Sequence, residues 1–421
     1  MPDSLNPFPD PISGLADLRK EKKGIDWLFL LACIAVFGFS LYIYAWQFQF
    51  VATDMHVHAT IASEFNFANL HTITSRTAYP LWHLCVSILF KLGIPLIWAS
   101  AIVCASAKTI GMWLAWLLLR IICRGQVHRS ILTLFAFLIM FVTAIRIPEV
   151  NAKVYRGVGS PSVWHNPTQI AVTVSMFLCV PYLAHCWYDF LRRLPHDKER
   201  ALLRPHQVLI LAVLLMFSLS CKPTFMQALI PAAAIFFLMM WIRYPKNSRF
   251  FFQIILAFLP AVLYFLLQYL YFTGVVVEFT SGVDFGATPE SVWLAIRSML
   301  MMAAFPLFAL FCCNRKELLR DKMLALTLLM AGISVLEAMF FRETGLRQGH
   351  GNFNWASMSV ALMLWVLMTG HFLRSYALFL KSARRAWRRW IAFGVGFALI
   401  VWHVGSGGYY LYFLLSSGSS F

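Results

Sequence analysis

The sequence predicts an all-α, polytopic integral membrane protein. Hydrophobic residues make up 60% of the 421 residues and charged residues only 13%, and the mean hydropathy is +0.70. A chain of this composition is too apolar to surround a water-soluble core. Apolar stretches of about 20 residues recur, which is the length that crosses a bilayer as a helix, whereas a β-barrel needs alternating segments of about ten residues.

We expect eleven membrane-spanning segments in a single module that covers 27–414. Their ranges are 27–47, 96–119, 130–147, 169–190, 206–221, 224–242, 250–273, 292–312, 323–341, 356–373 and 390–414. The nine cysteines lie almost wholly inside these segments without a Cys-x-x-Cys pair. They therefore indicate neither a disulfide framework nor a zinc site.

One further apolar stretch, 79–93, is about 15 residues long and contains His83 and Lys91. It is shorter than a usual span. Counting it as a span would also move every later loop to the other side of the membrane. We therefore interpret it as a juxtamembrane or re-entrant helix.

The net charge of +17 does not indicate nucleic-acid binding, because the basic residues gather in alternating connections between the spans. Lys and Arg favour the cytoplasmic side, which predicts a cytoplasmic leader at 1–26 and an extracytoplasmic tail at 415–421. No small-residue cleavage site follows the first apolar stretch, so we expect it to be retained. The basic connections are the leader, 120–129, 192–204, 243–249, 315–322 and 374–389.

With this topology, most of the remaining polar side chains fall in outer loops. Such a concentration on one face predicts an extracytoplasmic site in the plasma (inner) membrane. The outer loops are 48–95, 148–168, 274–291 and 342–355.

The first outer loop holds Asp54 before a surface helix, with His56 and His58 beside it. An ionised Asp within hydrogen-bond reach of a hydroxyl can act as a general base, so Asp54 is the candidate catalytic residue. The alternative is that Asp54 only caps the helix. Two histidines without a third ligand indicate a metal site weakly, and we expect His56 and His58 to contact substrate.

The second outer loop contains Arg146 and the run Trp164-His165-Asn166. One glycine and two prolines predict a rigid turn that presents this run just before a helix. An aromatic face beside amide and imidazole groups favours sugar binding. Equally, Trp164 fits an interfacial anchor and Asn166 fits a helix start.

The last outer loop combines three glycines with a dense set of hydrogen-bonding side chains. Arginine matches phosphate oxygens, although Glu337, one turn inside the membrane, is an alternative partner for Arg342 or Arg347. Lys222, between two spans, is a further candidate for an anionic headgroup, and Lys108 has no assigned role. The expected substrate-binding residues of this loop are Arg342, Glu343, Arg347, His350, Asn352 and Asn354.

An outward carboxylate, basic groups and a lipid-embedded frame together favour a sugar carried on a polyprenyl phosphate. Its tail lies in the bilayer, and its transfer needs a base for the acceptor and cations for the leaving phosphate. The sequence has neither a Gly-x-Gly-x-x-Gly fingerprint nor a P-loop. A nucleotide-sugar donor or an ATP-driven pump is therefore not indicated.

The chain resembles the GT-C superfamily of membrane glycosyltransferases in the position of Asp54 and in Tyr79-Pro80-Leu81. It is also similar to membrane proteins of bacterial capsule and exopolysaccharide clusters in 160–168 and 351–355. The resemblance implies hexosyl or pentosyl transfer from a polyprenyl-phosphate-linked sugar donor to a glycan or lipid-linked acceptor. It also implies inversion with Asp54 as the base. Many members carry paired acidic residues at this position, which the sequence lacks. It also lacks the large soluble C-terminal domain that some members carry.

Three other functions remain open. A polysaccharide polymerase or ligase would use the same lipid-phosphate substrate. A transporter or flippase would carry ionisable groups near the bilayer midplane and internal repeats, and a membrane acyltransferase could use His165 or His350 as its base. We expect no cofactor, and the sequence gives no support for a divalent metal.

Overall fold

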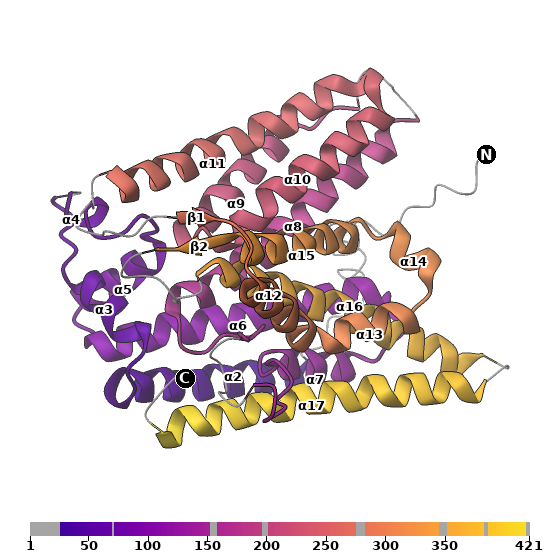
Figure 1. The fold of residues 1–421 in the computed structure, drawn as a ribbon, viewed down its shortest axis with the longest axis horizontal. Coiled ribbons are helices and arrows are strands. Elements are labelled where there is room, and N and C mark those ends of the chain that lie inside the picture. Colours follow the sequence, from indigo (N-terminus) through magenta and orange to yellow (C-terminus); the bar gives the residue numbers. More distant parts are fainter. Residues whose placement is uncertain are drawn as a thin grey trace.

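Long helices run between the two ends of one bundle in the computed structural model of the chain (Figure 1). The structure describes residues 26–69, 71–151, 158–195, 201–274, 283–344, 352–382 and 386–417. Within these ranges eight helices are long and apolar enough to cross a membrane. They are α2 (Trp27–Phe50), α6 (Leu96–Cys123), α8 (Pro167–Arg193), α10 (Thr224–Arg243), α11 (Ser248–Gly274), α15 (Lys322–Phe340), α16 (Trp355–Lys381) and α17 (Trp387–Ser417).

The other expected spans have different forms. The helices α12 (Pro289–Met302) and α13 (Ala304–Cys312) meet at a bend of 63° and make a ninth crossing if they count as one. Two more, α7 (Arg129–Ile139) and α9 (Pro205–Cys221), have only 11 and 17 residues. The prediction of an all-α membrane protein is confirmed. By length and composition the described helices give eight or nine candidate spans, so the count of eleven is not confirmed.

Shorter elements cap the bundle. At the end where α2 finishes lie α3 (Asp54–Ser63), α4 (His71–Thr74) and α5 (Leu81–Lys91), as Figure 1 shows. The 11 residues of α5 are too few to cross about 30 Å of hydrocarbon, in agreement with the interpretation of 79–93. The remaining short elements are η2 (Pro245–Asn247), β1 (Val283–Phe285), α14 (Arg315–Arg320), β2 (Phe341–Glu343) and η4 (Asn352–Asn354).

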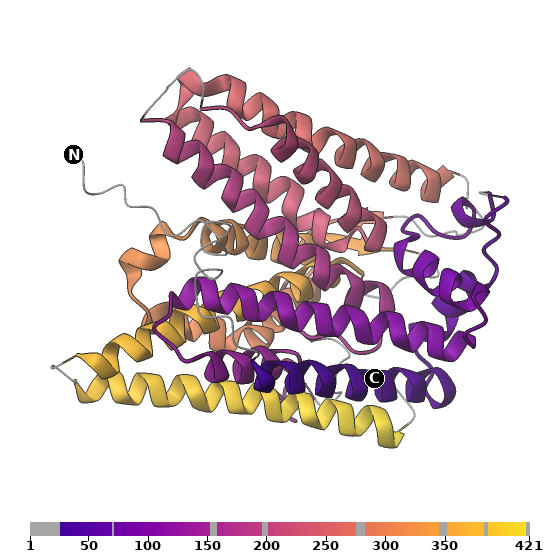
Figure 2. The ribbon, with the colours of Figure 1, turned by 180° about the vertical axis from the view of Figure 1, so that it is seen from behind.

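The centre of the bundle is α16. Its residues are buried without interruption from Trp355 to Leu373, as expected of a helix that is apolar on all sides. It packs against α6, α8, α10, α13 and α15. Outer helices instead expose apolar side chains such as Leu31 and Leu267. One of these outer helices, α2, runs alongside α6, as Figure 2 shows.

The expected span 130–147 is wrong at its C-terminal end. Helix α7 stops at Ile139, and the chain continues without helical structure inside the bundle. Non-helical backbone is tolerated at membrane depth only where other groups satisfy it. Here the carbonyl oxygen of Met140 accepts a hydrogen bond from Ser162 Oγ at 2.5 Å, and that of Thr143 lies 2.6 Å from His403 Nδ1.

Close packing against α17 helps to explain this break. A Cβ atom added at Gly407 would lie 1.6 Å from the carbonyl oxygen of Phe141. Only glycine leaves room for the unwound chain to pass at this distance. The sequence therefore places a glycine in α17 where the α7 segment needs space.

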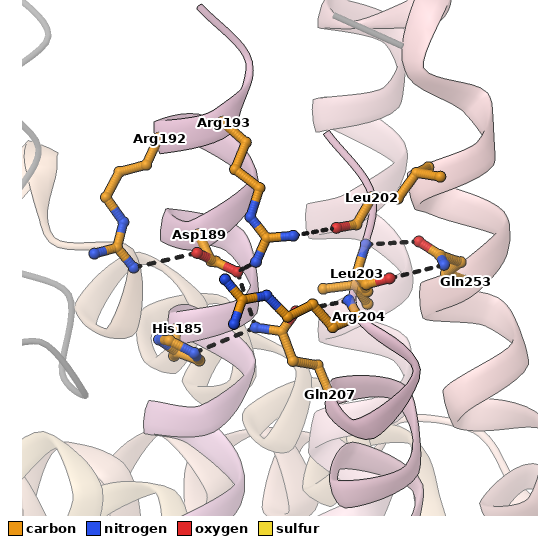
Figure 3. Close-up of polar contacts among 9 residues, drawn as sticks. All are labelled: His185, Asp189, Arg192, Arg193, Leu202, Leu203, Arg204, Gln207 and Gln253. Carbon is orange, nitrogen blue, oxygen red and sulfur yellow. Dashed lines mark hydrogen bonds and ion pairs between the residues drawn. The ribbon is translucent and has the colours of Figure 1, made fainter. Parts of the chain in front are cut away.

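The far end of the bundle carries a polar network (Figure 3). Asp189, near the end of α8, accepts hydrogen bonds from Arg193 and from Gln207 at the start of α9. Gln253 of α11 bonds both the N–H and the carbonyl of Leu203, at 2.7 and 3.0 Å. This network ties α8, α9 and α11 together. Asp189 follows Asn166 by 23 residues along α8, so at about 1.5 Å per residue this network lies about 35 Å from Asn166.

Candidate functional site

Asp54 is the first residue of α3, and three residues separate it from the end of α2 at Phe50. The N-cap of α3 is Thr53, whose Oγ1 accepts a hydrogen bond from the N–H of Met55 at 3.3 Å. The alternative that Asp54 serves as the N-cap is therefore wrong. Its side chain is exposed, and Oδ2 accepts a hydrogen bond from Asn166 Nδ2 at 2.5 Å.

Asn166 is the N-cap of α8, with Pro167 as the first helical residue. Its Oδ1 accepts hydrogen bonds from the N–H of Gln169 and from Thr168 Oγ1, both at 2.9 Å. This leaves the NH₂ group to face Asp54. Asn166 thus starts a helix, which confirms that interpretation of the residue. It also orients the candidate base.

Lys222 lies between α9 and α10 and approaches Asn166 from the other side. Its Nζ donates to Asn166 Oδ1 at 3.3 Å and sits 4.0 Å from the ring centroid of Trp355. Burial lowers the pKa of Lys222 to about 8, while the Asp54 and Glu343 carboxylates oppose that decrease. Asn166 therefore bridges an exposed carboxylate and a buried ammonium whose charge can change just above neutral pH.

His165 lies next to this bridge. Its Nδ1 is 2.8 Å from the hydroxyl of Tyr410 in α17. Burial lowers the pKa of His165 to about 4, with Asp54 raising it and Lys222 lowering it further. The imidazole is therefore neutral at pH 7 and acts as a hydrogen-bonding group beside the carboxylate.

The two histidines of α3 take different positions. His58 faces inward, and its Nδ1 lies 2.9 Å from His83 Nε2 of α5. Burial, with a smaller effect from Lys222, lowers the pKa of His58 to about 3. His56 is exposed beside the ring of Phe48. No three His, Cys, Asp or Glu side chains come together to hold a metal ion in the described part of the chain.

The second outer loop differs most from its expectation. Residues 158–166 are all buried, not exposed. Trp164 presents no free face: Lys108 Nζ lies 4.2 Å from its ring centroid, and the rings of Tyr44 and Phe141 stack on it. The expected sugar platform and interfacial anchor are both wrong for this side chain, because the segment folds into the bundle beside the broken end of α7.

Arg146 lies apart from the bridge. Its guanidinium carbon is 4.1 Å from the ring centroid of Tyr409, and its backbone N–H donates to Ser406 Oγ at 3.0 Å. Both partners belong to α17. The structure therefore holds Arg146 against that helix and does not bring it to Asp54.

The last outer loop contributes in part. Arg342 forms an exposed ion pair with Asp284 at 3.0 Å, across the antiparallel strands β1 and β2. Glu343, the next residue, is close enough to influence Lys222. Glu337 Oε2 is buried without a hydrogen-bond partner among the described residues, so the alternative pairing of Glu337 with Arg342 is wrong. The other alternative partner, Arg347, lies outside the described residues.

The other residues of that loop are only partly described. Arg347 and His350 lie outside the described residues. Asn352 begins the 3₁₀ turn η4, and Asn354 ends it as the N-cap of α16. The Oδ1 atom of Asn354 is buried with no hydrogen-bond partner in the described ranges.

Sequence reasoning missed the buried support around Asn166. Gln169 donates to Ser359 Oγ at 2.6 Å and accepts from Thr224 Oγ1 at 3.0 Å, which joins α8 to α16 and α10. Trp355 and Tyr410 hold Lys222 and His165. A glutamine in the first turn of an apolar helix was the available signal, because polar groups at that depth need partners.

Comparison with protein-family models and with curated proteins found no match to the chain.

Proposed function

We propose that this protein is a membrane glycosyltransferase that moves a sugar from a polyprenyl-phosphate-type lipid donor to an extracytoplasmic glycan or lipid-linked acceptor. One observation carries the proposal: Asn166 joins the exposed carboxylate of Asp54 to the buried ammonium of Lys222. Both groups lie at one end of an apolar bundle. A donor with its tail in lipid would bring its phosphate to the same level.

The proposed step is a single displacement. Asp54 accepts the proton of the acceptor hydroxyl, whose oxygen forms a bond to the anomeric carbon of the sugar. The bond from that carbon to the phosphate oxygen breaks, and the electron pair leaves with the lipid phosphate. Lys222 stabilises the charge on the leaving phosphate. The exposure of Asp54 lets its proton return to water.

Asp54 and Lys222 differ in solvent exposure, and this difference fits their proposed roles. Asp54 must be reached by an acceptor from water, and its side chain is exposed. Lys222 has three N–H donors, and its hydrogen-bond acceptor among the described residues is Asn166. Its other donors are available to phosphate oxygens. The other polar groups near these two residues are Glu343 and the neutral His165.

The proposed topology has eleven crossings in a GT-C-like arrangement. It counts α9, the bent pair α12 and α13, and α7 together with its non-helical continuation to 147 as crossings. Helix directions carry Arg193, Arg204 and Arg243 to the end opposite Asp54. Basic residues favour the cytoplasmic side. The site would then face outward from the plasma membrane of a bacterium, where capsular or exopolysaccharide synthesis uses lipid-linked sugars.

The test uses the full chain in lipid nanodiscs with polyprenyl phosphates that carry a hexose or a pentose. Mass spectrometry measures free polyprenyl phosphate, which any sugar transfer must release. We expect release by the wild type, loss in Asp54→Asn and normal release in Glu64→Gln, an exposed carboxylate at the other end of α3. No release from any donor, or equal release by Asp54→Asn, contradicts the proposal.

The same preparation separates the alternatives. A polymerase or ligase would release the lipid phosphate only with a long glycan as acceptor. A flippase or transporter is favoured by one feature, the buried Lys108 in the middle of α6. In proteoliposomes it would move the lipid-linked sugar between leaflets without releasing lipid phosphate.

A further inference from the structure

Lys108 is a charged residue in the middle of a membrane-spanning helix, and the proposed reaction does not use it directly. It lies in α6, and its side chain is only 4% exposed. Its hydrogen-bond acceptor among the described residues is a hydroxyl, Ser162 Oγ at 2.6 Å, rather than a carboxylate. A buried ammonium is costly in a membrane, so such a residue normally has a functional reason.

The ammonium of Lys108 contacts two residues of the buried segment 158–166. Besides the hydrogen bond to Ser162, Nζ lies 4.2 Å from the ring centroid of Trp164, within range of a cation–π interaction. Ser162 in turn donates through Oγ to the carbonyl of Met140 and through its N–H to the carbonyl of Val142. Lys108 therefore fastens this segment to the broken end of α7.

The rest of the segment is held as firmly. Gln47 of α2 donates to the carbonyl of Trp164 at 2.8 Å. Gly159 has a φ angle of +83°, and a Cβ atom there would lie 2.7 Å from Met358. The segment thus has little freedom to shift along its length. Asn166 ends it, four residues after Ser162 and two after Trp164.

We infer that Lys108 is a positioning residue: by holding Ser162 and Trp164 it sets the Asn166 amide against Asp54 and Lys222. The distance from Asn166 to Asp54 is 2.5 Å, so a small shift of the segment breaks that bond. The structural part of this inference is independent of the reaction. Its consequence for sugar transfer rests on the proposed function.

Hydrogen exchange of the full chain in nanodiscs tests the structural part. We expect the amides of 158–166 to exchange about tenfold faster or more in Lys108→Met, because local opening becomes easier. The amides of 201–207, in the far polar network, should exchange as in the wild type. Lys91→Met, an exposed lysine at the end of α5, serves as the control and should change neither region.

Ser162→Ala keeps the test decisive if Lys108→Met fails to fold. This change removes the acceptor and leaves the charge in place, and it should also speed exchange at 158–166 without changing 201–207. Exchange at 158–166 that stays at the wild-type rate in a folded Lys108→Met protein overturns the inference. The same result in Ser162→Ala overturns it as well.

Transfer kinetics test whether Lys108 acts through Asn166. Misplacement of a catalytic group costs about a hundredfold, so Lys108→Met should lower kcat by between about tenfold and that limit, with donor KM changed less than about twofold. The double variant Lys108→Met/Asn166→Ala should be no slower than Asn166→Ala alone. If the double variant is slower by the product of the two single losses in kcat, the inference is overturned. An inactive wild type rejects the proposed function, while the exchange result still decides the positioning role.

Discussion

The side-chain amide of Asn166 donates a hydrogen bond to Oδ2 of Asp54 at 2.5 Å, although 112 residues separate the two in the sequence. Asn166 caps α8 and Asp54 begins α3. The contact therefore fixes the start of a surface helix against the start of a central one. It also leaves the second oxygen of the carboxylate for an incoming hydroxyl.

This contact predicts the effect of Asn166→Ala. The variant loses the group that orients Asp54, so the rate of transfer should fall about a hundredfold. It also loses a helix cap, which should lower the free energy of unfolding by about 1 kcal/mol. Steady-state transfer and thermal unfolding measure the two effects.

Asn314→Ala provides a matched control, since Asn314 caps α14 at the other end of the bundle. It should show a similar loss of stability with normal transfer. Equal transfer rates in the two variants would contradict an orienting role for Asn166.

Lys222 predicts a decline of activity on the alkaline side. Because burial lowers its pKa to about 8, the ammonium loses its charge as the pH rises through that value. The pH profile of kcat/KM reports the pKa values of groups in the free protein, and it should fall as the pH rises above about 8. Lys222→Arg should move the decline upward, because arginine stays protonated. Lys246→Arg, at an exposed far-end lysine, should not move it, and an unshifted decline in Lys222→Arg would rule out this assignment.

The same pKa gives a prediction for stability. Between about 8 and the ordinary value of 10.5, the folded chain binds fewer protons at Lys222 than the unfolded chain. The free energy of unfolding therefore rises with pH across this window, and the cost of burying the charge is fully present below it. Lys222→Met should remove this contribution to the pH dependence.

Two aspartates, one buried and one exposed, predict different losses of stability. Asp321 and His371 are buried, with 2.8 Å between Oδ2 and Nε2, and Asp321 Oδ1 also caps α15. Asp321→Ala leaves His371 Nε2 and the N–H groups of Met323 and Leu324 without this partner, so it should lower the free energy of unfolding by about 1–3 kcal/mol for each group left buried and unpaired. Asp284→Ala, which breaks the exposed pair with Arg342, should cost about 0–1 kcal/mol. Denaturant unfolding in detergent compares the two variants, and equal losses would contradict the buried position of Asp321.

The sequence predicted the helices well where composition alone determines them. The apolar run at 27–47 became α2, and the short stretch at 79–93 became α5. The end of α7 could not be predicted, since its apolar residues continue past Ile139. The break depends on partners from distant helices: His403 for the freed carbonyls and Gly407 for the space.

The candidate site was predicted as a set of residues on one face, and its internal contacts were not. Glycine, prolines and polar residues in 158–168 are typical of an exposed turn, whereas burial of this segment depends on α2, α6 and α17 closing around it. Arg342 also pairs with Asp284 through strands of three residues, too short to leave a pattern. Only the assembled bundle brings Asn166 and Lys222 to Asp54.

In the proposed reaction, Asp54 removes the proton of the acceptor hydroxyl. The most direct test of this role compares donor binding and transfer between Asp54→Asn and the wild type. We predict that this variant binds the polyprenyl-phosphate-linked sugar with a Kd close to that of the wild type, because Lys222 remains, while transfer falls at least about a hundredfold. Transfer at the wild-type rate in Asp54→Asn would rule out Asp54 as the base.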